Sequence, residues 1–169
     1  MKRTKLAKAS KQTKPKLKKK TAYALMKEYG MPYASKSNLR YKNPIEKGIA
    51  WFWFAHYIRL RDCQIWGTCI SCGKTITFDN TDAGHFIAAS NCGLDLLMDE
   101  RNVNAEHSGC NAYDQNHLLG YEKNLDIRYG AGTAAKLKER YFSQKIVKIS
   151  NWGEIALKYK NQYGNTKVE

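Results

Sequence analysis

The sequence of 169 residues contains no long apolar run, and this absence excludes a class of proteins. A helix that crosses a membrane needs about 20 consecutive, predominantly apolar residues. No such stretch occurs, and no apolar segment follows the basic N-terminus, so we expect neither a membrane span nor a signal peptide. We therefore expect a cytoplasmic protein with no membrane partner.

The chain also lacks the even number of cysteines that is typical of a disulfide framework. Its five cysteines are Cys63, Cys69, Cys72, Cys92 and Cys110. An odd number, with one Cys-x-x-Cys pair and no secretion signal, favours reduced thiols and a metal site over disulfides.

Acidic residues are missing from the first 20 positions, where ten residues are Lys or Arg. The other 149 residues hold 19 basic and 15 acidic side chains, so most of the net charge of +14 lies in this tail. Such a block cannot bury apolar surface, and we expect it to be disordered and to bind a polyanion. DNA is the expected partner, through Lys16, Lys18, Lys19 and Lys20, and the alternative is a tail that only improves solubility.

Helix and strand signals predict an α+β fold. Asn43 is the expected cap of a helix, with Pro44 at its first position and Glu46 three residues after the cap, and this helix should continue to about Asp62. Alternation of Thr and apolar residues at 74–79 predicts a strand. A turn at 79–81 and a second strand at 82–87 would complete a hairpin. Further helices are expected at 23–29, from about His107 past Asn116, and at 118–129, 133–142 and 151–163. For the last of these, Asn151 with Glu154 repeats the capping signature.

The same signals divide the chain into four regions. We expect a basic tail at 1–20, a linker at 21–43, a core domain at 44–130 and a helical extension at 131–169.

Two short pairs of metal-binding residues lie 34 residues apart. Cys69-x-x-Cys72 is typical of a knuckle that offers two sulfur atoms from a tight turn, and His107-x-x-Cys110 offers two ligands from one face of a helix start. Zinc prefers four such ligands in a tetrahedron. The spacing therefore predicts a structural Cys3His zinc site, with isolated buried thiols as the alternative.

Between and beside these pairs lie Asp82, His85, Asn102 and Asn111. Each has an ordinary structural interpretation, since a histidine in a strand usually packs and an asparagine at a helix start usually caps. Together they suggest a small nuclease site, because an imidazole can accept a proton from water and an Asn oxygen can bind a hard divalent ion.

Several strings recur here in a specific order: Cys69-Ile-Ser-Cys72-Gly, Asp82-Ala-Gly-His85-Phe, Asp99-Glu-Arg-Asn102-Val-Asn and Cys110-Asn111. In these strings the chain resembles the HNH nucleases, and more narrowly the NinG (Rap) phage recombination endonucleases. The resemblance covers roughly residues 50–135.

The resemblance implies a ββα-metal core with a zinc knuckle, flanked by N- and C-terminal helices. It implies that His85 is the general base, that Asn111 holds a catalytic Mg²⁺ or Mn²⁺, and that Asn102 braces the loop that orients His85. Asp82 would be a second metal ligand or would orient the histidine. The zinc ligands would be Cys69, Cys72, His107 and Cys110.

The chain departs from the HNH pattern at several positions. Gly84 stands where many HNH enzymes have an acid directly before the histidine, although the NinG type shares this glycine. His107-x-x-Cys110 replaces the usual Cys-x-x-Cys, an exchange that zinc accepts. Asn104 stands where the family has a histidine. Gln115 and His117 follow Asn111 by about one helical turn or more, and either is a candidate for a role at the site.

The expected function is cleavage of phosphodiester bonds in branched DNA, such as Holliday junctions or D-loops, and this substrate class comes from the resemblance alone. One site cuts one strand, so a double cut requires a homodimer or two visits. The alternatives are a nicking or homing HNH endonuclease and a non-catalytic zinc-knuckle DNA-binding protein. No helix-turn-helix signature is evident, which favours recognition of structure over sequence.

Overall fold

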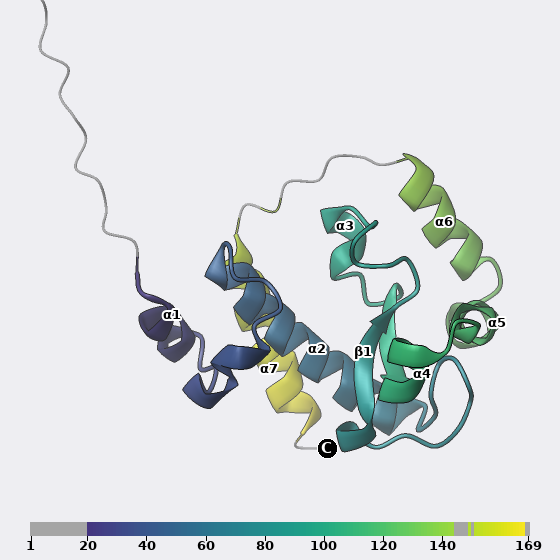
Figure 1. Cartoon of the computed structure of the whole chain (residues 1–169), viewed down its shortest axis with the longest axis horizontal. Coiled ribbons are helices and arrows are strands. Elements are labelled where there is room, and N and C mark those ends of the chain that lie inside the picture. Colours follow the sequence, from purple (N-terminus) through teal and green to yellow (C-terminus); the bar gives the residue numbers. More distant parts are fainter. Residues whose placement is uncertain (1–19, 144–148, 150, 168–169) are drawn as a thin grey trace, which may run out of the picture.

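A computed structural model describes residues 20–143, 149 and 151–167. The fold is mixed α and β, mostly helical, with one two-stranded sheet among the described residues (Figure 1). The long helix α2 (Ile45–Ile65) lies at the centre, and α7 (Trp152–Thr166) packs along it. The sheet packs against α2 as well. No helix in the described part of the chain is long and apolar enough to cross a membrane.

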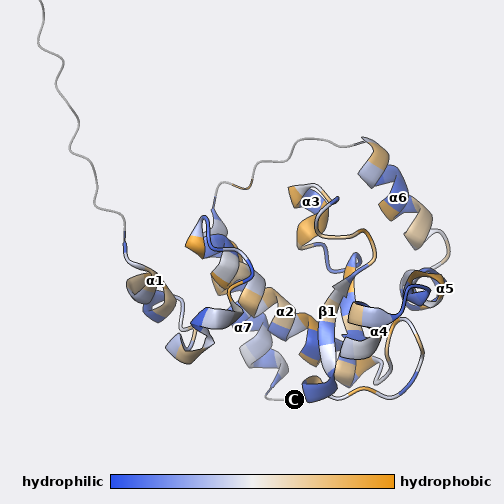
Figure 2. Cartoon of the chain, in the orientation of Figure 1, coloured by the Kyte–Doolittle hydropathy of each residue, from blue (hydrophilic) through white to orange (hydrophobic). Residues whose placement is uncertain are grey.

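Helix α2 carries the largest apolar cluster. Four consecutive residues from Trp51 to Phe54 are buried, which an isolated surface helix would not allow. They are buried because α7 and the sheet both cover α2, and Figure 2 shows orange, hydrophobic segments along it. The helix begins at Ile45 with Pro44 as its N-cap, and no side chain caps it. The predicted Asn43 cap is therefore wrong, and the helix ends at Ile65 rather than Asp62.

Strand β1 (Thr81–His85) pairs antiparallel with β2 (Val103–His107), from Thr81 opposite His107 to His85 opposite Val103. The predicted hairpin of 74–79 with 82–87 is wrong in its first strand. Residues 74–79 form only an isolated bridge from Thr75 to Thr68, because the chain turns back sharply at 69–74. The short 3-10 helix η2 (Phe78–Asn80) then ends the extended run.

The connection between the strands is long and contains α3 (Leu94–Leu97). After β2 the chain enters α4 (Ser108–Tyr113) without a loop. The helix expected to continue past Asn116 therefore ends at Tyr113. Next come α5 (His117–Tyr129) and α6 (Thr133–Ser143), which pack on each other and agree closely with their predicted ranges.

The two chain ends of the described region meet the same core. Helix α1 (Ala22–Glu28) and the 3-10 helix η1 (Tyr33–Asn38) lie in the segment expected to be a linker. Leu25 and Met26 from this segment are buried in the cluster that also includes Tyr159 of α7. The predicted cap of α7 is confirmed, since the Asn151 side chain accepts a hydrogen bond from the Glu154 amide at 3.2 Å.

Candidate functional site

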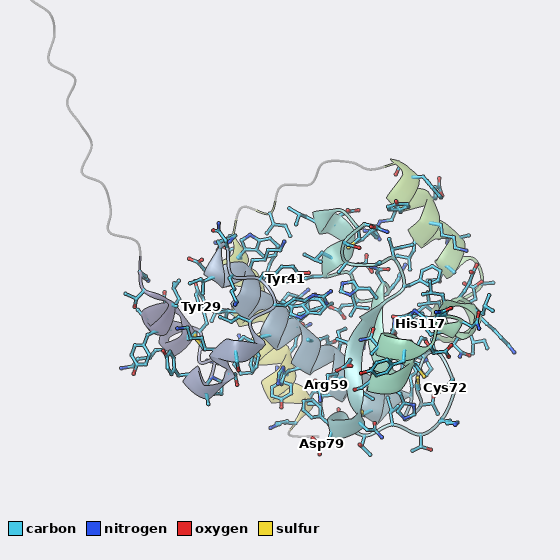
Figure 3. The ribbon with its side chains drawn as sticks, viewed as in Figure 1. Tyr29, Tyr41, Arg59, Cys72, Asp79 and His117 are labelled. Carbon is cyan, nitrogen blue, oxygen red and sulfur yellow. The ribbon has the colours of Figure 1, made fainter. Side chains whose placement is uncertain are left out.

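The predicted zinc ligands come together in space. One ligand atom from each of Cys69, Cys72, His107 and Cys110 lies within 4.8 Å of the others. Cys69 and Cys72 lie in a tight turn, where the Cys69 amide donates to the Lys74 carbonyl at 2.8 Å. His107 ends β2 and Cys110 lies in α4, so the group joins the turn to the sheet and the helix. Figure 3 labels Cys72 near α4.

The chemistry of this group suits a structural metal such as zinc. His107 Nε2 lies 3.1 Å from the Thr75 carbonyl oxygen, so this nitrogen donates its proton. That hydrogen bond leaves the lone pair on Nδ1, which lies 3.3 Å from Cys72 Sγ. A ligand histidine in proteins usually makes this kind of second contact with its other nitrogen.

The thiols also have unequal proton affinities. Burial raises the pKa of Cys72, but hydrogen bonds, led by the one from the Lys74 amide and including those from the neighbouring thiols, outweigh it and lower the pKa to about 7. Burial and the adjacent Cys72 and Cys69 raise the pKa of Cys110 to about 12. Thiols this close together compete for protons. A divalent metal would displace these protons and be bound by all three sulfur atoms as thiolates.

A second group forms where α4 crosses β1. Asn111 of α4 donates from Nδ2 to Asp82 Oδ2 of β1 at 3.5 Å. Both side chains line an open cleft of about 350 Å³ whose walls include Trp51, Phe52 and Arg59. The structure thus brings together two of the residues that the sequence singled out.

A neighbouring cleft of about 340 Å³ contains the predicted histidine. Its lining includes His85, His117 and Arg40. Arg40, Ala83 and Asn111 line both clefts, so the two hollows adjoin each other. Figure 3 labels Arg59 and His117, which lie on either side of β1 in that view.

His85 is fixed at the end of β1. Its Nε2 lies 3.0 Å from the Leu97 carbonyl oxygen, so Nε2 carries the proton and Nδ1 carries the lone pair. The ring stacks on Trp51 with centroids 5.0 Å apart and an interplanar angle of 12°. Burial lowers the pKa of His85 to about 4, and the charge of Arg40 acts in the same direction. The imidazole is therefore neutral at physiological pH.

Asn102 is completely buried and holds the connection between the strands. Its Oδ1 accepts from the Ile87 amide at 2.7 Å. Its Nδ2 donates to the carbonyls of Ile87 at 3.2 Å and Leu96 at 3.0 Å. These bonds fix the loop whose Leu97 carbonyl binds His85.

The remaining candidates differ in their surroundings. Asn104 is buried in a hydrogen-bond network, where its Oδ1 accepts from Tyr129 at 2.7 Å and its Nδ2 lies 3.3 Å from the Tyr121 hydroxyl. Gln115 is exposed in the turn after α4. Lys20 pairs with Glu28 at 2.6 Å on the surface. Lys16, Lys18 and Lys19, with the rest of the basic tail, lie outside the described residues.

Sequence reasoning missed two side chains at this site. Glu106 of β2 is buried, and its Oε1 lies 2.7 Å from His117 Nδ1. Arg40 lies over the Trp51 ring at 5.1 Å from the centroid. The only available signal for Glu106 was its place one residue before the zinc-ligand pair, and nothing in the sequence marked Arg40.

Comparisons with known proteins complete the description of the chain. A search of curated proteins and a search of solved structures each gave no match. A family model described as "NinG: Bacteriophage Lambda NinG protein" matches residues 1–169. Because the match covers the whole chain, the narrower resemblance to the NinG family is confirmed, and the chain belongs to that family.

Proposed function

We propose that this chain is a metal-dependent DNA endonuclease with a ββα-metal core of the HNH type. In this proposal the core consists of β1, β2 and α4, and the Cys3His group braces it. One observation carries the proposal: Asp82 and Asn111 meet at a cleft that adjoins the one lined by His85. Two oxygen-bearing side chains beside a neutral imidazole form the donor set that metal-assisted hydrolysis requires.

Each residue has a distinct part in this mechanism. Asp82 and Asn111 would hold one Mg²⁺ or Mn²⁺, since both ions prefer oxygen ligands. The chemistry supplied by such an ion is stabilisation of the charge that develops on the phosphate and on the leaving 3′ oxygen. His85 accepts the proton of the attacking water at Nδ1, and Asn102 maintains the loop that holds the other ring nitrogen.

The surroundings of the site support a nucleic-acid substrate. Arg40 and Arg59 bring positive charge to the clefts, and Trp51 and Phe52 bring aromatic surface. The tail at 1–20 adds ten basic residues that suit contacts with phosphates. We propose branched DNA as the substrate, on the strength of the family, and action in the cytoplasm of a bacterial host. Cutting both strands would require a homodimer or two visits.

A cleavage assay tests this proposal. The zinc-loaded chain is incubated with linear, nicked, flap, D-loop and four-way DNA, with Mg²⁺, with Mn²⁺ or with neither ion. We expect metal-dependent cleavage of the branched forms, and loss of cleavage in Asn111→Ala that excess Mn²⁺ partly restores. The matched control is Asn161→Ala, because Asn161 is exposed on α7.

The other outcomes identify the alternatives. Cutting of linear DNA at a fixed sequence would indicate a nicking or homing endonuclease instead. Tight DNA binding with no cleavage of any form would indicate a zinc-knuckle DNA-binding protein.

A further inference from the structure

Glu106 is a buried carboxylate that the mechanism above does not use. It lies on β2 directly opposite Asp82 of β1, and its relative exposure is 0%. Its Oε1 accepts two hydrogen bonds, from His117 Nδ1 at 2.7 Å and from the Ser71 hydroxyl at 2.5 Å. Its Oε2 is buried as well, and it has no hydrogen-bond partner among the described residues.

The unpartnered oxygen lies beside Gly84, and so does the side-chain oxygen of Asn111. A Cβ atom added to Gly84 would collide with Glu106 Oε2 and would lie 3.2 Å from Asn111 Oδ1. Both oxygens therefore lie close to the same point, which a side chain at position 84 would occupy. The amide nitrogen of Asn111 is engaged elsewhere, because Nδ2 donates to Asp82.

Two acceptor oxygens in the same small space repel, and the buried carboxylate oxygen of Glu106, which has no hydrogen-bond partner among the described residues, costs free energy. A cation between them removes both penalties. The two donors on Oε1 hold the carboxylate in one orientation, in the way that surrounding hydrogen bonds orient ligand carboxylates.

We propose that Glu106 is a ligand of a divalent cation, together with Asn111 Oδ1 and Asp82. The cation is Mg²⁺ or Mn²⁺, because every ligand is a hard oxygen. This inference rests on the proposed function, since Asp82 and Asn111 serve the same ion. The competing explanation is a protonated Glu106 that donates a hydrogen bond to Asn111 Oδ1.

Glutamine at position 106 separates the two explanations. Its amide keeps the shape of the side chain and can donate to Asn111 Oδ1, but it removes the negative charge that binds a cation. We would titrate the zinc-loaded full chain with Mn²⁺ and follow free Mn²⁺ by electron paramagnetic resonance. The variants are Glu106→Gln, Asp82→Asn and the matched control Glu122→Gln, whose carboxylate lies on the surface of α5 and pairs with Lys138.

We expect one Mn²⁺ site in the wild type, and an affinity at least about tenfold weaker in Glu106→Gln. The control should match the wild type. Circular dichroism and zinc content establish that each variant is folded. Glu106→Asp is the second variant, which keeps the charge but shortens the side chain, and it should also weaken binding.

Wild-type Mn²⁺ affinity in either folded variant would overturn the role of Glu106. If Asp82→Asn weakens binding while Glu106→Gln does not, the ligand inference fails and the proposed nuclease site stands. If the wild type binds no Mn²⁺ beyond the zinc site, both the ligand inference and the metal site of the proposed function fail.

Discussion

Replacement of Cys72 by serine should unfold the region around β1, β2 and α4. Cys72 is the exposed member of the Cys3His group, so the substitution removes little buried surface and isolates the effect of metal binding. Structural zinc contributes an apparent free energy of about 10–16 kcal/mol near pH 7. A domain of this size has a net free energy of unfolding of only about 5–15 kcal/mol. A two-stranded sheet is too small to be stable alone, so most of this local stability should be lost.

The assay combines elemental analysis with thermal unfolding followed by circular dichroism. The wild type should hold one zinc per chain, and Cys72→Ser should hold none and melt far lower or aggregate. Cys92→Ser is the matched control, because Cys92 is half-buried and lies outside the metal-ligand group. A zinc-free wild-type protein that is well folded would refute the reasoning, as would a zinc-free Cys72→Ser with an unchanged melting temperature.

Three further changes have expected results. Asn102→Ala removes hydrogen bonds to three backbone groups, the Ile87 amide and the carbonyls of Ile87 and Leu96. It should lower the free energy of unfolding by about 2–4 kcal/mol in chemical denaturation and reduce cleavage, and an unchanged cleavage rate would contradict its role in holding the loop. Gly120→Ala should lower the free energy of unfolding by about 1–3 kcal/mol, because the added Cβ would collide with the Ser71 carbonyl. The control Gly164→Ala meets open space, so it should leave the stability unchanged or raise it in the same denaturation experiment. Deletion of residues 2–20 should weaken binding to linear and four-way DNA alike. If about five charges contact phosphates, the slope of log K against log salt concentration should flatten by about 4 to 5 units. An unchanged slope would show that the tail does not bind DNA.

The helices after the site were predictable because their ends carry local signals. Gly130 ends α5 with a φ of 98°, a conformation that favours glycine. Asn151 caps α7 through its own side chain. Such signals depend only on neighbouring residues, so the sequence alone predicts these ends. The Cys3His group was predictable for a similar reason, since each of its two pairs lies within four residues.

The sheet was harder to predict because its strongest contacts are distant in sequence. Residues 74–79 alternate like a strand, but the turn at 69–74 directs Thr75 back to Thr68. Strand β2 shows no simple alternation, since its first four residues are all buried and two of them, Asn104 and Glu106, are polar. Each of them also contacts a residue of α5, and no local pattern could have identified those contacts.

The most direct test of the proposed nuclease is the single-turnover rate of His85→Ala on four-way DNA with Mg²⁺ or Mn²⁺. Loss of a general base typically lowers the rate by about 10²–10⁴-fold. We expect a loss of that size while zinc content, circular dichroism and DNA affinity stay near wild type. A folded His85→Ala protein that cuts at the wild-type rate would contradict the assignment of His85 as the base.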